Sequence, residues 1–97
     1  MNLINRSLVS QYDLQLEKMQ EALTGHDRET ADLLRTWREE LRSASDRAAL
    51  KAHAARTSRS MGGMGSLGEV VMIGNNPEEL RLLEELYAIC KFILSSE

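Results

Sequence analysis

The sequence has little of several residue types, and each scarcity excludes a class of protein. It holds one cysteine, one proline and two histidines among 97 residues. A single cysteine rules out an internal disulfide framework. No apolar run approaches the roughly 20 residues that a transmembrane helix needs, and the first residues lack the apolar stretch of a signal peptide. We therefore expect a cytoplasmic protein that does not span a membrane.

Aromatic residues and excess charge are also scarce. Only 4% of the residues are aromatic, so the core must rest on aliphatic side chains and methionine. The formal net charge is −3, because 15 carboxylates outnumber 12 lysines and arginines. This balance argues against a nucleic-acid-binding protein, which would need a positive surface. The length and the 42% apolar fraction suit one globular domain, and we expect residues 1–97 to form a single helical domain.

Apolar residues recur at steps of three and four through the first 42 residues, which marks one face of an α-helix. Gly25 ends the first run, and Asp27 is placed to cap the next helix. The first run consists of Ile4, Leu8, Tyr12, Leu16, Met19 and Leu23. The second helix has an apolar stripe of Leu33, Leu34, Trp37 and Leu41.

Two further helices follow, and both have clear starting signals. Asp46 caps an alanine-rich helix that runs from about Arg47 to Ser60. Asn76 at the cap and Pro77 at the first helical position open the last helix, which runs to about Leu94. Its expected inward residues are Leu80, Leu83, Leu86, Tyr87, Cys90, Ile93 and Leu94.

A glycine-rich break separates these two helices, with glycines at Gly62, Gly63, Gly65 and Gly68. Four glycines in so short a stretch disfavour a helix and indicate a turn that glycine shapes. Residues 69–73 have a β-like composition, and we expect a short extended segment packed on the core. A short helix begun by Ser66, with Glu69 in a capping box, and an edge strand awaiting a partner are the alternatives. The expected fold is all-α, a bundle of about four helices with this break before the last one.

The break spells two motifs whose context does not fit. Residues 63–68 read G-x-G-x-x-G, but a dinucleotide site needs a strand before the glycines and a helix after them. A helical pattern comes before the glycines here. Residues 62–65 read G-x-x-G, which RNA-binding domains use within a sheet that this sequence lacks. We interpret both motifs as chance matches within a turn whose backbone conformation requires glycine.

No catalytic or metal-binding pattern is evident, and we expect neither an enzyme nor a cofactor. His26 and His53 stand alone, without the three or four ligands of a metal site, and are expected to be solvated or hydrogen-bonded. Cys90 falls on an apolar stripe and is expected to be a core thiol. Adjacent carboxylates such as Glu78 and Glu79 do not face each other on a helix, so we expect them on solvated faces.

A resemblance suggests a function. Trp37 and Leu41 form a W-x-x-x-L helix pattern, and a G-G-M-G-S turn over residues 62–66 and a closing helix follow it. The chain resembles, from about Leu14 onward, a family of small bacterial helical proteins of unassigned function. Such proteins are encoded near polymorphic toxin genes, which implies an immunity protein that covers the active site of a cognate toxin domain. The family usually has Asn-Asp after the turn, where this chain has Gly68 and Glu69.

The resulting hypothesis is a toxin-neutralising protein that meets a basic active-site cleft. Acidic side chains would face the cationic cleft, and a methionine at the turn would serve as an apolar anchor. The residues expected to bind the partner are Asp32, Glu39, Glu40, Met64, Ser66 and Glu69. The alternative is a structural or regulatory helical module without a toxin partner. Such a module could form a homodimer in which residues 70–73 pair across a two-fold axis.

Overall fold

The computed structural model describes residues 6–61 and 67–95, and within them the chain forms five α-helices joined by short turns, with no strand. The helices are α1 (Arg6–Thr24), α2 (Arg28–Arg42), α3 (Arg47–Arg59), α4 (Leu67–Gly74) and α5 (Pro77–Ser95). The all-α class is confirmed, with one helix more than expected. No helix in the described part of the chain is long and apolar enough to cross a membrane.

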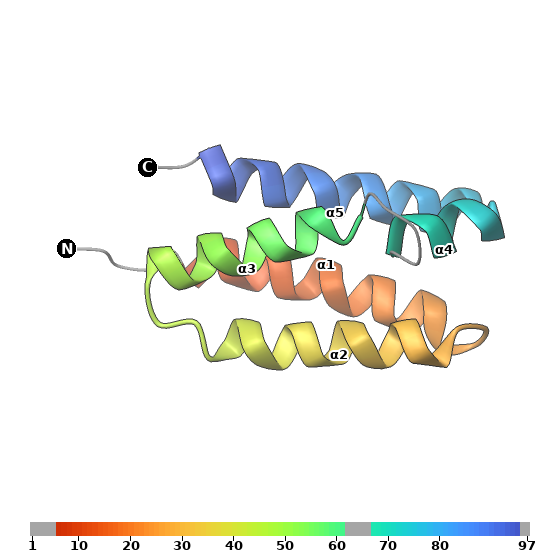
Figure 1. The fold of residues 1–97 in the computed structure, drawn as a ribbon, viewed down its shortest axis with the longest axis horizontal. Coiled ribbons are helices and arrows are strands. Elements are labelled where there is room, and N and C mark those ends of the chain that lie inside the picture. The colour runs from red at the N-terminus through yellow and green to blue at the C-terminus, as the bar shows by residue number, and fades with distance from the viewer. Residues whose placement is uncertain (1–5, 62–66, 96–97) are drawn as a thin grey trace.

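The five helices occupy only four positions of an up-and-down bundle. α1 packs against α2 and α5, and α3 packs against α2 and α5. Figure 1 shows that α4 continues the direction of α3 on the far side of the break, so that together they form the third leg. α4 then packs on the first part of α5. The estimate of about four helices therefore describes the legs of the bundle, one of which is broken.

The sequence signals for helix ends operate as expected. The Asp27 carboxylate accepts from the Thr30 N–H at 3.0 Å, and the Asp46 carboxylate accepts from the Ala49 N–H at 2.8 Å. Asn76 Oδ1 accepts from the Glu78 N–H at 2.9 Å. Each of these bonds satisfies an amide that a helix leaves without an internal partner.

The extended segment expected at residues 69–73 is wrong, because these residues belong to helix α4. Leu67, Gly68 and Val71 are all buried on one face of the helix, whereas consecutive residues of a strand, such as Leu67 and Gly68, point to opposite faces. Packing against α5 therefore overrides the β-branched composition. The alternative of a short helix is correct, while the capping role of Ser66 lies outside the described residues.

The position of Gly68, the second residue of α4, requires glycine. The Leu67 N–H donates to the Ser60 carbonyl at 2.9 Å, so the first residue of α4 is hydrogen-bonded to the C-terminal end of α3. A Cβ at Gly68 would overlap the backbone carbonyl of Met61. The structural role expected for Gly68 is therefore a close backbone approach. Gly62, Gly63 and Gly65 lie outside the described residues.

The core draws on all five helices and matches the expected stripes at most positions. Tyr12, Leu16, Met19 and Leu23 are fully buried on α1, as their spacing predicted. Three expected core residues are instead exposed, and the expectation was wrong for Leu33, Tyr87 and Leu94. Each is adjacent to a buried residue, and consecutive helical residues point about 100° apart. The buried face is thus narrower than the apolar stripe in the sequence.

Candidate functional site

The residues expected to bind a partner lie on two different legs. Asp32, Glu39 and Glu40 lie on α2, whereas Glu69 lies on α4. Asp32 is 3.5 Å from Arg35 on the same helix, and Glu40 is 3.0 Å from Arg56 of α3. The α2 carboxylates are therefore partly neutralised by neighbours. Met64 and Ser66 lie outside the described residues.

A different surface stands out at the junction of α4 and α5. Met72 is 67% exposed and Ile73 is 76% exposed, the highest values among the exposed large apolar side chains of the described residues. α4 buries Leu67, Gly68 and Val71, and Val70 packs partly on the core, which leaves Met72 and Ile73 in solvent. We call the surface formed by Glu69, Met72, Ile73 and Glu78 the corner.

Two asparagines fix the shape of the corner. Asn75 adopts a left-handed conformation with φ of 50°, which ends α4, and its N–H donates to the Val71 carbonyl at 3.1 Å. Asn76 then caps α5 through the Glu78 and Glu79 amides. The chain thus turns from one helix into the next within two residues. Met72 and Ile73 are held on a backbone that is hydrogen-bonded on both sides.

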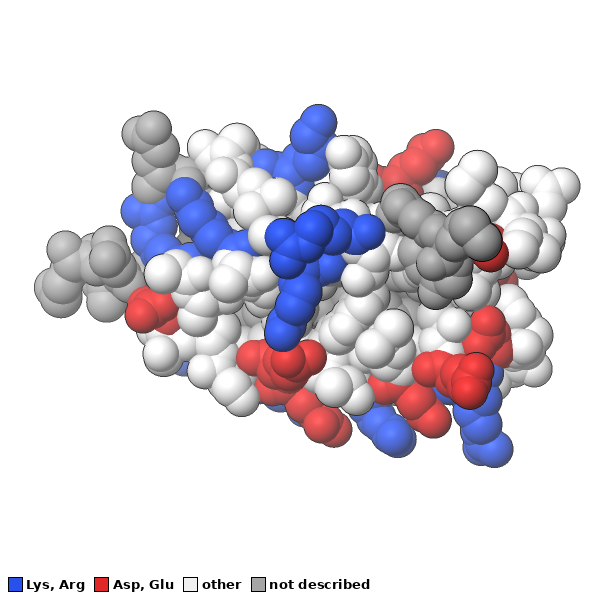
Figure 2. All heavy atoms as spheres, in the orientation of Figure 1, with Lys and Arg blue, Asp and Glu red and all other residues white. Residues whose placement is uncertain are grey.

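Charge is unevenly distributed between the corner and α3. Residues 67–86, which include the corner, contain five carboxylates and one cation, Arg81. Residues 42–59 contain five cations and one carboxylate, Asp46. Figure 2 shows Lys and Arg side chains gathered over α3, with Asp and Glu side chains beneath them along α2. The acidic balance of the whole chain therefore conceals a basic face.

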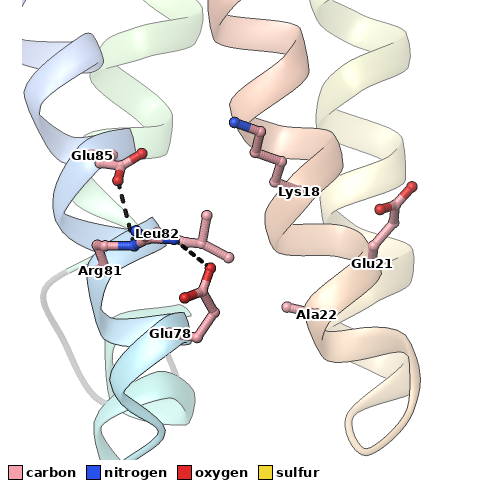
Figure 3. Close-up of a pocket in the computed structure, with 7 residues that line it drawn as sticks. All are labelled: Lys18, Glu21, Ala22, Glu78, Arg81, Leu82 and Glu85. Atoms are coloured by element: carbon pink, nitrogen blue, oxygen red, sulfur yellow. Dashed lines mark hydrogen bonds and ion pairs between the residues drawn. The ribbon is translucent and has the colours of Figure 1, made fainter.

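An open groove of about 580 Å³ lies beside the corner, between α1 and α5. Figure 3 shows Ala22 and Leu82 between the helices and charged side chains around them. Arg81 lies 2.6 Å from Glu78 and 3.8 Å from Glu85, and this pairing holds two carboxylates along the α5 wall. Lys18 and Glu21 line the α1 wall. The groove extends the acidic surface of the corner along α5.

Glu79 departs from the solvated position expected for it. Its side chain is only 6% exposed, and its Oε2 lies 2.8 Å from His26 Nε2, while His26 is half exposed. The other oxygen, Oε1, is buried and has no hydrogen-bond partner. The pair connects the α1–α2 loop to the first turn of α5. His26 is hydrogen-bonded, which agrees with its expected state.

A buried polar cluster lies away from the corner and joins three helices, α1, α2 and α3. His53 Nε2 is 2.7 Å from the Trp37 carbonyl, and since a carbonyl only accepts, this nitrogen carries the ring proton. Nδ1 of a neutral ring then accepts from the Tyr12 hydroxyl at 2.7 Å. The Thr57 hydroxyl lies 2.8 Å from the Tyr12 hydroxyl. Each member has a partner inside the protein, so the cluster is structural.

Cys90 lies in the core beside this cluster, as its position on an apolar stripe predicted. Burial raises the pKa of its thiol to about 11, and a bond to Tyr12 opposes the rise. Burial also raises the pKa of Tyr12. A thiol is a nucleophile only when ionised. Cys90 is therefore protonated at neutral pH and chemically inert.

The protonation of His53 gives a pH-dependent stability. Burial lowers the pKa of His53 below its usual 6.5, and the bond to the Trp37 carbonyl opposes the shift. Below a pH of about 6.5, His53 therefore binds a proton in the unfolded chain but stays neutral in the folded chain. The free energy of unfolding should fall as the pH drops from about 6.5 to 5.

In His53→Gln the slope of the free energy of unfolding against pH should be shallower by up to about 1.4 kcal/mol per pH unit. Urea unfolding at several pH values measures both slopes, and equal slopes would contradict the neutral ring.

Known proteins and metal chemistry give no further guide to the site. Comparison with protein-family models, curated proteins and solved structures gave no match for this chain. Within residues 6–61 and 67–95, no group of three or more His, Cys, Asp or Glu side chains could hold a metal ion.

Proposed function

We propose that this chain is a cytoplasmic immunity protein that binds a bacterial toxin domain and occludes its active site. The corner is the surface that would enter the toxin's cleft. The exposure of Met72 and Ile73 carries this proposal, because two adjacent apolar side chains on a capped turn suit a buried anchor. Such anchors supply most of the affinity of a protein interface.

Charge supports a cationic partner. Between Arg59 and Arg81 the chain has no lysine or arginine, while Glu69 and Glu78 of the corner fall in this interval. The third carboxylate of the interval, Glu79, is buried against His26 and adds nothing to the surface. Toxins that act on nucleic acid or other anionic substrates have cationic clefts, and an acidic surface speeds association with them. The groove carboxylates beside Arg81 would extend the contact along α5.

Occlusion requires no chemistry from this chain. A protein that fills a cleft excludes the substrate by volume, and its own side chains need only fit and desolvate well. The turn from α4 to α5 lies at one end of the bundle, as does the α1–α2 loop, and this end is the part proposed to enter the cleft (Figure 1). Met72 and Ile73 replace Met64 here as the proposed anchors.

The test is co-expression with the product of the neighbouring gene, the candidate toxin. That product should stop growth alone and be tolerated with the wild-type chain. Met72→Ser/Ile73→Ser should abolish protection, because truncation of anchors commonly weakens binding by at least about 2 kcal/mol each. Phe92→Ser is the matched control, since Phe92 is 61% exposed but lies at the other end of α5. A harmless neighbour, or equal protection by both variants, would refute the proposal.

A further inference from the structure

The basic face of α3 is a second surface that the proposed function does not use. Lys51, Arg56 and Arg59 lie on this helix, which contains no carboxylate. Arg56 pairs with Glu40, while Lys51 and Arg59 form no ion pair with any described residue. Ala48 and Ala52 are exposed between these cations. We call the surface formed by Ala48, Lys51, Ala52 and Arg59 the α3 face.

The α3 face and the corner have complementary chemistry. The corner presents two protruding apolar side chains, Met72 and Ile73, next to carboxylates. The α3 face presents the short side chains of two alanines between two cations. Alanine side chains are short, so large side chains can approach the helix closely over them. Opposite charges at the edges would fix the register of such a contact. Both halves of this contact exist on one chain.

We propose that the corner of one molecule docks on the α3 face of a second copy. The corner of a molecule does not lie against its own α3 face, because the two surfaces follow one another along the same leg of the bundle (Figure 1). The contact is therefore heterologous, and repetition leads to open head-to-tail chains instead of a two-fold dimer. A single helix face is smaller than a standard interface, so the association is weak and concentration-dependent.

This self-association would place a toxin and a second copy in competition for the corner. It rests on the complementarity of the two surfaces and stands whether or not the partner is a toxin. Self-association at high concentration would cover Met72 and Ile73 when no partner is present. A cognate partner with higher affinity would release single molecules.

Sedimentation velocity over a range of protein concentrations tests the proposal. The wild-type chain should associate in about 10 mM salt and be largely monomeric in about 1 M salt, where charges are screened beyond roughly 3 Å. Lys51→Gln/Arg59→Gln and Met72→Ser/Ile73→Ser should each be monomeric alone. All four positions are at least partly exposed, so both variants keep the core.

Mixing the two variants gives the decisive result. Each retains the surface that the other lacks, so an equimolar mixture should form a 1:1 dimer that does not grow further. A wild-type chain that stays monomeric in low salt would overturn the proposal. So would an association lost only in the Met72→Ser/Ile73→Ser variant and not restored by mixing, because that result indicates a two-fold contact between corners. Toxin protection by Lys51→Gln/Arg59→Gln should be intact, which separates this proposal from the proposed function.

Discussion

Gly68→Ala should destabilise the chain by about 3 kcal/mol, at the upper end of the usual cost of overpacking. The added Cβ meets the backbone carbonyl of Met61, which cannot rotate away as a side chain would. Relief requires α4 to move off α3, and this breaks the bond from the Leu67 amide to Ser60. The free energy of unfolding of a domain of this size is about 5–15 kcal/mol, so the substitution should remove a large fraction of it. Thermal unfolding should show the midpoint lowered by more than about 10 °C.

Gly25→Ala is the matched control for this prediction. A Cβ at Gly25 meets no atom within 4 Å, so this substitution should leave the midpoint nearly unchanged. Equal midpoints for Gly68→Ala and the wild type would mean that the backbone of α4 does not approach Met61. In that case the position of the corner would also need revision.

His53→Leu should cost about 2–4 kcal/mol, although leucine is a good core residue. The substitution leaves the Trp37 carbonyl without its partner and removes the acceptor of the Tyr12 hydroxyl. A buried polar group left unpaired costs about 1–3 kcal/mol. Urea unfolding gives the loss directly.

His53→Gln separates hydrogen bonding from packing. The glutamine amide can donate from its NH2 group to the Trp37 carbonyl and accept at its oxygen from the Tyr12 hydroxyl, so His53→Gln should retain more stability than His53→Leu. In the double variant Tyr12→Phe/His53→Leu the Tyr12 hydroxyl is gone, and the total loss should be smaller than the sum of the two single losses. Additive losses would show that the cluster does not act as a unit.

Local rules predicted the parts of the fold that local chemistry decides. Asp27, Asp46 and Asn76 were recognised as caps, because a short polar side chain before an apolar period has one common use. The buried residues of α1 followed from their spacing. These features depend on residues within one turn of each other.

The errors arose where distant packing decides the outcome. Residues 69–73 have a composition that suits a strand, but they pack on helix α5, and no strand in the described residues is available to pair with them. Glu79 was placed in solvent because its partner, His26, is 53 residues away in the sequence. The corner was missed for the same reason, since the sequence does not reveal which of residues 70–73 face α5. The presence of four consecutive apolar residues in a short helix was the available signal, because a helix cannot bury all of its faces against one neighbour.

The claim that the corner contacts a partner is tested most directly by amide hydrogen exchange. The chain is measured alone and in complex with the product of the neighbouring gene. Protection should increase in residues 67–80, which contain α4 and the turn into α5, and should be unchanged in residues 86–95. Added protection confined to α2 or to the C-terminal half of α5, with none in residues 67–80, would contradict the account.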